Sequence, residues 1–327
     1  MPAPTQEQPR RIGVVHLSQV GDLMFSLPAL SALRAGFPGA RVVSIVKEPL
    51  EPLLRGNSLV DEIVLHRGSR DFFASLGRLR ASELDLMVCL SQSPRARLLA
   101  YGSGAPRRAG LGSGRLASLL TEAVAASGPP STANNLRLTS ALGCPVVSPD
   151  YQGLLRAEDQ DLVGARAVLR EAGWDGDGEV VVFAGGASRG REHKEWPGER
   201  LMEACRLSAA RGGVWSVVVG TERRSGIEHA PAEGVLDLTG RTGLRQLMGL
   251  LDLARLFVGI DSGVLHVAAA LGTSCIALFG PTDPRQTGPQ GEGHRVLRAA
   301  EDGPGPMDAI EVGRVARAVD RALGRVG

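Results

Sequence analysis

Short apolar runs rich in β-branched residues alternate with segments of helical periodicity along most of the chain. Strands are predicted at 11–17, 40–46, 61–66, 85–90, 179–185, 215–220, 256–260 and 275–280. Helices are predicted at 28–35, 95–101, 158–173, 197–211, 243–254 and 263–271. Runs that are apolar on both faces and joined by helices are typical of parallel sheets covered on both sides. The pattern therefore predicts an α/β protein with two doubly wound sheets.

The boundary between the two predicted domains falls where turn residues give way to a charged helical stretch. This places a linker near 148–157, between a first Rossmann-like domain at 1–153 and a second at 154–306. The last segment, 307–327, has apolar residues at helical spacing and predicts a terminal helix that packs back across the domain junction.

Length and composition agree with two ordinary globular domains. The chain has 327 residues, of which 43% are hydrophobic and 22% are charged. No stretch approaches the roughly 18 apolar residues of a membrane span, and the first residues lack the apolar centre of a signal peptide. Four scattered cysteines show neither a CxxC pair nor metal-ligand spacing, which predicts reduced thiols. We therefore expect a cytoplasmic protein.

The charge is distributed unevenly between the two halves. Residues 1–150 contain 16 basic and 11 acidic side chains, a net charge of +5, whereas the remainder contains 21 and 24, a net charge of −3. No acidic residue lies between Asp85 and Glu122. An anionic partner and an ordinary solvated surface are equally good interpretations. The arginines of this basic run, 95–115, are Arg95, Arg97, Arg107, Arg108 and Arg115.

The first candidate for chemistry is Asp22, in the turn Ser18-Gln19-Val20-Gly21-Asp22 after the first strand. Ligands of open α/β sheets bind beyond the carboxyl ends of the strands, so a carboxylate here can serve as a general base. Capping of the following helix is the alternative, and spacing alone favours it. The turn is not a dinucleotide fingerprint, because it lacks GxGxxG.

The second candidate is Lys194, in the glycine-rich loop that follows the strand at 179–185. Backbone amides of such a loop, which includes Gly185 and Ser188, can bind phosphate oxygens. A lysine there can balance the charge that develops on a leaving diphosphate. A solvated lysine paired with its acidic neighbours is the competing interpretation.

The third candidate is the segment from Asp261 to Pro284. A strand ends at Asp261, and the exposed amides of the helix that begins after Ser262 and Gly263 form an anion site suited to a nucleotide diphosphate. His266 lies one turn into this helix, where a structural role is the commoner one. Thr282, in the GPTDP turn at 280–284, can line the same pocket.

A further carboxylate, Glu222, follows the strand at 215–220. Acidic residues at strand ends bind ribose hydroxyls in Rossmann folds, so Glu222 is a candidate for nucleoside binding. A solvated surface charge is the alternative.

Taken together, these segments resemble glycosyltransferase family 9, the ADP-heptose:lipopolysaccharide heptosyltransferases. The resemblance rests on SQVGD with SLPAL at 18–30, KEWP at 194–197, and DSGVLHVAA at 261–269 followed by GPTDP at 280–284. Each motif alone is weak, but their order and spacing over nearly the whole chain make the combination specific.

The resemblance implies a GT-B fold, with the acceptor bound by the first domain and the nucleotide sugar by the second. It implies a metal-independent, inverting transfer that needs no cofactor, with Asp22 as the base and Lys194 stabilising the departing ADP. It assigns donor binding to Glu222, Asp261, Ser262, Gly263, His266, Thr282, Gly185 and Ser188. We further expect the acceptor to be bound by Ser18, Gly21, Arg95, Arg107 and Arg108.

The implied acceptor is a phosphorylated lipopolysaccharide precursor at the inner membrane surface, with no role for nucleic acid. A protein acceptor of the autotransporter type is the nearest alternative. A nucleotide-sugar epimerase or a non-catalytic binding protein of the same fold also retains the phosphate site. Retention of both Asp22 and Lys194 favours transfer.

Overall fold

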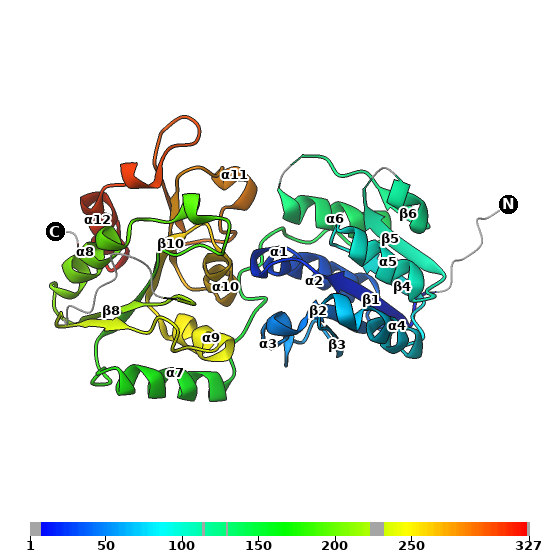
Figure 1. The fold of residues 1–327 in the computed structure, drawn as a ribbon, viewed down its shortest axis with the longest axis horizontal. Coiled ribbons are helices and arrows are strands. Elements are labelled where there is room, and N and C mark those ends of the chain that lie inside the picture. The colour runs from blue at the N-terminus through cyan, green and yellow to red at the C-terminus, as the bar shows by residue number, and fades with distance from the viewer. Residues whose placement is uncertain (1–7, 113–114, 129, 223–231, 326–327) are drawn as a thin grey trace. The chain divides into compact units, whose positions relative to one another are not determined.

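The computed structural model describes residues 8–112, 115–128, 130–222 and 232–325, and the side chain of Arg115 lies outside this description. The chain divides into two compact units, residues 1–149 and 150–327. Figure 1 shows that each unit is a sheet with helices on both faces.

The first unit contains one six-stranded sheet in the order β3-β2-β1-β4-β5-β6, and every pair in it is parallel. Its strands are β1 Arg11–His16, β2 Arg41–Lys47, β3 Glu62–His66, β4 Leu86–Cys89, β5 Arg107–Leu111 and β6 Glu122–Val124. Its α-helices are α1 Val20–Met24, α2 Leu27–Gly36, α3 Glu51–Leu54, α4 Phe72–Ala81, α5 Pro94–Gly102 and α6 Ser131–Ala141.

The second unit repeats this arrangement with its own six parallel strands, in the order β12-β11-β10-β7-β8-β9. Its strands are β7 Glu179–Ala184, β8 Val214–Val218, β9 Val235–Asp237, β10 Leu256–Ile260, β11 Cys275–Phe279 and β12 Arg295–Arg298. Its α-helices are α7 Asp159–Glu171, α8 Gly198–Ala209, α9 Leu244–Leu253, α10 Gly263–Leu271, α11 Pro284–Thr287 and α12 Val312–Ala322.

Both sheets therefore have the Rossmann order, and the prediction of a GT-B α/β fold is confirmed at the level of the two sheets. The predicted strands correspond to β1 to β4, β7, β8, β10 and β11. The strands β5, β6, β9 and β12, toward the sides of the sheets, were not predicted; β5 and β12 begin with arginine, and β6 and β9 have only three residues.

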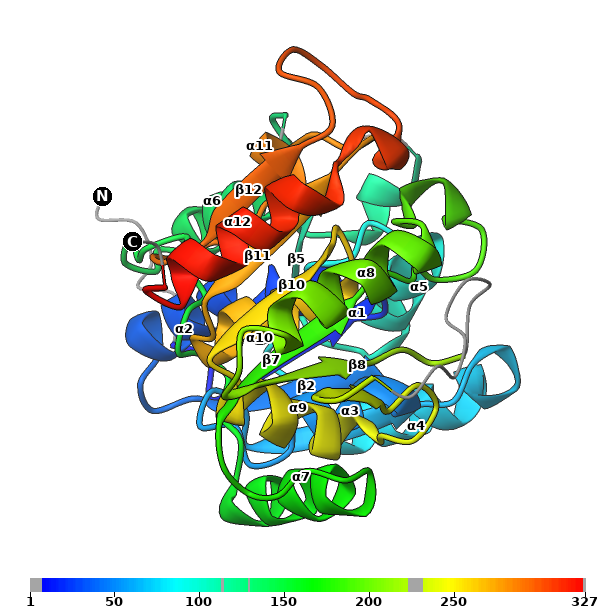
Figure 2. The same ribbon diagram turned by 90° about the vertical axis from the view of Figure 1, so that its left-hand side faces the viewer.

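Apolar side chains from both faces of each sheet form the cores. In the second unit, Val181 and Phe183 of β7 are fully buried beneath Leu201 of α8 and Val315 of α12. Figure 2 shows α8 and α12 on the same face of this sheet. The predicted terminal helix is thus α12, which packs into the core of the second unit; its reach across the junction stays a prediction.

The helix α10 lies close to its sheet because Ala268, Ala269 and Ala270 are small and fully buried. It ends at Gly272, whose φ of +94° is the left-handed conformation that glycine adopts at helix ends. Close packing here fixes the beginning of α10, and with it the loop after β10.

Candidate functional site

The loops after β7 and β10 meet at the carboxyl edge of the second sheet. These two strands are neighbours at its centre, and the chain leaves them toward opposite edges of the sheet, β8 and β9 on one side and β11 and β12 on the other. Such a switch point leaves a crevice beyond the strand ends, which is where ligands bind in open α/β sheets. Most residues predicted to bind the donor phosphates come after these strands, and Thr282 follows the adjacent β11.

A buried ion pair joins the two loops. Lys194 Nζ lies 2.7 Å from Asp261 Oδ2, and the two side chains are 10% and 6% exposed. Lys194 ends a short 3₁₀ turn, Glu192–Lys194. The loop around it is held by the Trp196 amide, which donates to the Gly185 carbonyl at 3.2 Å. The structure therefore brings together two predicted site residues that the sequence separates by 67 positions.

The Asp261 carboxylate is held in its ionised form. Burial by itself raises its pKa, but hydrogen bonding to His266 and Lys194 and the charge of Lys194 outweigh burial and place the pKa well below its usual range. His266 Nε2 lies 3.7 Å from Asp261 Oδ1, the oxygen that does not bind Lys194. The carboxylate thus has a basic side chain near each oxygen.

Tyr151 orients the His266 ring and was not predicted as a site residue. Its hydroxyl lies 3.0 Å from His266 Nδ1 and accepts a hydrogen bond from the Gln290 amide at 3.3 Å. This contact orients the ring so that Nε2 faces Asp261. No local sequence pattern could have indicated this, because Tyr151 lies 115 positions from its partner.

Two hydroxyls beside the ion pair are buried without a hydrogen-bond partner of good geometry within the described residues. They are Ser262 Oγ, at the N-cap of α10, and Thr282 Oγ1, which also helps to lower the pKa of Asp261. Buried hydroxyls normally find a partner, so that of Ser262 can donate to an incoming oxyanion, whereas that of Thr282 faces Asp261. Gly263 begins α10 and leaves its amide at the same helix start.

The remaining predicted donor residues differ in burial. Gly185 is buried directly after β7, whereas Ser188 is exposed further along the same loop. Glu222 is exposed beyond the end of β8 and is the last described residue before 223–231. The structure does not bring the Glu222 side chain to the Lys194–Asp261 pair, so its role in nucleoside binding stays a prediction.

A second cluster lies at the carboxyl edge of the first sheet, where β1 and β4 form the equivalent switch point. Ser18 Oγ donates to Ser91 Oγ at 3.2 Å, and Ser91 Oγ donates to Ser93 Oγ at the same distance. Ser93 also caps α5 by accepting from the Ala96 amide. Of these hydroxyls, only that of Ser18 was predicted to belong to the site.

Asp22 caps a helix and also has a carboxylate oxygen that is available for chemistry, the two roles considered from the sequence. It is the third residue of α1, and its Oδ2 accepts a hydrogen bond from the Gln19 amide at 3.1 Å, so it does cap the helix. Its side chain is nevertheless exposed, and Oδ1 makes no hydrogen bond to the described residues. Capping with one oxygen leaves the other available to accept a proton. Gly21 lies beside it in the same turn of helix.

The basic run 95–115 does not converge on one surface. Arg95 lies at the start of α5, at the carboxyl edge, and donates to Ser69 Oγ at 2.7 Å. Arg107 and Arg108 begin the unpredicted strand β5 and therefore lie at the opposite, amino edge of the sheet.

These two arginines already have partners at that edge. Arg107 pairs with Glu122 at 2.9 Å, and Arg108 donates to the carbonyls of Ala105 and Leu119. The structure thus does not bring Arg107 and Arg108 together with Ser18, because a parallel strand that starts with them carries them away from the crevice, and their binding of the acceptor stays a prediction.

The part of the chain that the structure describes contains neither a candidate metal centre nor a membrane-spanning helix. Within the described ranges, no group of three His, Cys, Asp or Glu side chains is arranged to hold a metal ion. None of the described helices is long and apolar enough to cross a membrane.

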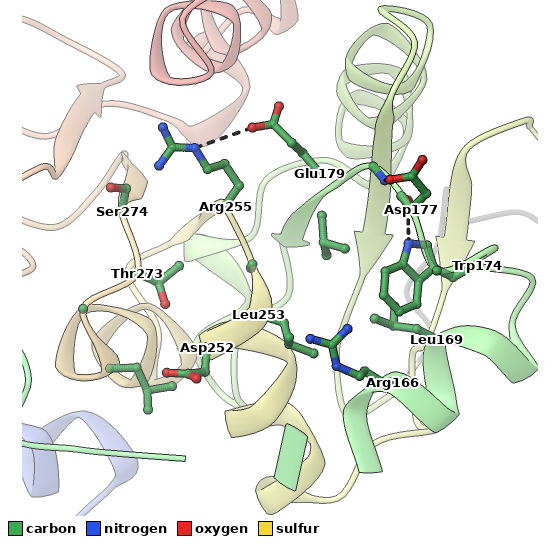
Figure 3. A pocket seen from close by; sticks show the side chains of 16 residues that line it. Arg166, Leu169, Trp174, Asp177, Glu179, Asp252, Leu253, Arg255, Thr273 and Ser274 are labelled. Carbon is green, nitrogen blue, oxygen red and sulfur yellow. Dashed lines mark hydrogen bonds and ion pairs between the residues drawn. The ribbon is translucent and has the colours of Figure 1, made fainter. Parts of the chain in front are cut away.

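A cavity of about 540 Å³ lies at the amino edge of the second sheet. Figure 3 shows its side chains, among them Arg255, which pairs with Glu179, and Trp174, which donates to the Asp177 carbonyl. Because Glu179 begins β7 and Arg255 precedes β10, the cavity lies at the end of the strands opposite the Lys194–Asp261 pair. Its lining includes none of the predicted donor-binding residues.

Comparison with known proteins places the chain among sugar transferases. Residues 73–308 match the profile of glycosyltransferase family 9 (heptosyltransferase). Lipopolysaccharide heptosyltransferase 2 of Escherichia coli K12 is 26% identical, over 88% of each chain. The solved family 9 glycosyl transferase of Veillonella parvula has a TM-score of 0.84 at 20% identity, covering 97% of this chain and 98% of that one. The E. coli heptosyltransferase WaaC with ADP has a TM-score of 0.77 at 21% identity, covering 95% and 99%.

Proposed function

Since the chain belongs to glycosyltransferase family 9, the heptosyltransferase family, we propose that it transfers a heptose from ADP-heptose to a lipopolysaccharide inner-core acceptor. The observation that carries the donor half is the buried Lys194–Asp261 pair beside the buried, unsatisfied hydroxyl of Ser262. Support for an adenosine diphosphate comes from a relative of the same fold that was solved with ADP.

The second unit holds the donor in this proposal. An ammonium group has three donors, and Lys194 uses one of them on Asp261, so two remain for diphosphate oxygens. The Gly263 amide and the positive end of the α10 dipole add to this attraction. The role of Asp261 is to hold Lys194 in place, and that of His266 and Tyr151 is to hold Asp261.

The first unit supplies the base. Asp22 Oδ1 accepts the proton of an acceptor hydroxyl while that oxygen forms a bond to the anomeric carbon of the heptose. The bond from this carbon to the diphosphate breaks in the same step, and ADP departs with the electron pair. Lys194 and the helix start stabilise the charge that develops on ADP. A single displacement inverts the anomeric configuration and uses no metal ion or other cofactor.

The proposed acceptor and its location come from the same family. The heptosyltransferase of E. coli K12 acts on lipopolysaccharide according to its name. An enzyme that uses such a precursor works in the cytoplasm at the inner membrane surface, where anionic lipids and a basic first unit attract one another. We therefore propose peripheral association with that surface.

The test is a donor screen read by mass spectrometry. The purified protein is incubated with ADP-heptose, UDP-sugars and GDP-sugars, a deacylated inner-core acceptor, and EDTA. We expect ADP-heptose alone to give a glycosylated acceptor, with the inverted anomer identified by NMR. Transfer from a UDP- or GDP-sugar refutes the proposed donor, and loss of activity in EDTA that added metal restores refutes the metal-free mechanism. Consumption of donor without acceptor product refutes the proposed acceptor.

A further inference from the structure

A buried arginine in the first unit has a charge that the described residues do not neutralise. Arg97 lies in the first turns of α5 and is 7% exposed. Its Nη2 donates to the carbonyl of Leu111 at 2.9 Å. A guanidinium carries five N–H donors, and among the described residues this is the one hydrogen bond that the Arg97 side chain makes. Within the described ranges, the Arg97 guanidinium forms no ion pair with a residue of α5 or of the neighbouring strands.

Arg97 lies in the first unit, at the edge of the sheet that the proposed function assigns to the acceptor. Leu111 is the last residue of β5, and α5 begins directly after the loop that follows β4. The guanidinium therefore lies at the carboxyl edge of the sheet, the edge that also carries Ser18, Ser91 and Asp22. This distinguishes it from Arg107 and Arg108, which lie at the amino edge.

The backbone beside Arg97 is shaped to make room for its guanidinium. Gly112 has a φ of +139°, and a Cβ atom built there would lie 2.0 Å from Arg97 Nη2. A side chain at position 112 is thus excluded by both the conformation and the space. The glycine leaves the guanidinium against the main chain instead of in solvent.

The sequence around Arg97 offers no carboxylate to neutralise this charge. The stretch from 86 to 121 contains no Asp or Glu, so the loop after β5 cannot supply one. The flanking acids are engaged elsewhere: Asp85 accepts from the backbone amide of Arg11 at 2.9 Å, and Glu122 pairs with Arg107. Burying a cation without an anion is costly, which indicates that an anion comes from outside the chain.

We propose that Arg97 binds an oxyanion of the acceptor, a carboxylate or a phosphate, and so positions the acceptor hydroxyl at the carboxyl edge of the first sheet. The planar fork of a guanidinium matches both groups. The identity of the anion as part of the acceptor rests on the proposed function, whereas binding of an oxyanion by Arg97 does not.

The first experiment measures binding of inorganic phosphate to the full chain by calorimetry, with ADP present to fill the donor site. In Arg97→Gln we expect phosphate to bind about tenfold to a hundredfold more weakly, since a charge-assisted hydrogen bond is lost. The affinity for ADP stays unchanged, and the melting temperature without ligand is equal or higher, because the unneutralised charge is gone. Arg80→Gln is the matched control, because Arg80 also donates to a carbonyl, that of Gly102, but is exposed.

Unchanged phosphate affinity in Arg97→Gln overturns the inference and leaves Arg97 a structural residue. If Arg97→Gln fails to fold, Arg97→Lys retains the charge without the fork and is expected to bind phosphate more weakly than the wild type. Equal binding in Arg97→Lys and in the wild type then overturns the inference. Failure of the wild type to bind ADP counts against the proposed function alone.

A second experiment identifies the source of the anion. The KM for a deacylated inner-core acceptor is compared in wild type and Arg97→Gln, before and after its phosphates are removed. A ratio of KM values that falls to near one without phosphates identifies a phosphate as the ligand. A ratio that persists identifies a carboxylate. A ratio near one for both acceptors overturns the inference.

Discussion

Lys194 Nζ and Asp261 Oδ2 lie 2.7 Å apart in the second unit, although 67 positions separate the two residues. The pair exists because the loops after β7 and β10 meet where the strand order changes direction. It holds a cation at a helix start that also attracts anions. Both the stability of the second unit and its affinity for the donor should therefore depend on this pair.

Removing the lysine alone should destabilise the protein strongly. Lys194→Met leaves Asp261 buried with an uncompensated charge, and we expect the free energy of unfolding to fall by about 3–5 kcal/mol. The double variant Lys194→Met with Asp261→Asn removes both charges and should recover much of that loss. Chemical denaturation of both variants measures this difference. ADP binding, measured by calorimetry, should remain weak in the double variant, since no cation faces the diphosphate; a restored affinity would contradict the role of Lys194.

Two substitutions distinguish the role of Asp22 as a helix cap from its proposed role as a base. Asp22→Asn retains an oxygen that accepts from the Gln19 amide, whereas Asp22→Ala removes it. We expect transfer activity to fall by roughly 10²–10⁴-fold in both variants, because neither can accept the proton. Only Asp22→Ala should also lose stability, by about 1 kcal/mol. Substantial activity in Asp22→Asn, measured as kcat, would show that another group serves as the base.

His16 should make the stability of the first unit depend on pH. It is buried at the end of β1, its Nδ1 lies 2.9 Å from Ser26 Oγ, and burial lowers its pKa to about 3. The unfolded chain, with an ordinary histidine pKa near 6.5, then binds a proton that the folded chain does not. The free energy of unfolding should therefore decrease as the pH falls, by about 2 kcal/mol between neutral pH and pH 5.

Denaturation at several pH values measures this slope. His16→Asn, which can still place an amide nitrogen near Ser26, should flatten it. His193→Gln changes an exposed histidine and serves as the control. An unaltered slope in His16→Asn would show that other groups cause the pH dependence.

The close approach of α7 and α9 depends on Gly249. A Cβ atom at this position would lie 2.1 Å from the Asp161 carbonyl oxygen, and a backbone atom cannot move aside as a flexible side chain can. Gly249→Ala should lower the free energy of unfolding by about 1–3 kcal/mol. The matched control is Gly164→Ala in α7, where the added atom meets only the Gln246 side chain at 3.4 Å. That variant should be neutral or gain up to about 1 kcal/mol, because alanine favours helix. Thermal unfolding compares the two.

The alternation of apolar runs and helical segments was sufficient to predict two parallel α/β sheets, since a strand buried on both faces must be apolar throughout. The same pattern predicted the strand ends that carry Asp22, Lys194 and Asp261. It did not predict β5, a strand of five residues toward the side of the sheet, and so could not show that Arg107 and Arg108 lie at the amino edge.

Only the tertiary structure decided which of these residues meet. The contacts of Lys194 with Asp261, and of Tyr151 with His266, join segments 67 and 115 positions apart. Arg97 became distinct from its neighbouring arginines only through its burial against Gly112. Local sequence sets the propensity and polarity of each element. Desolvation and pairing of charges depend on the order of the strands and the packing of helices on them, which are properties of the folded chain.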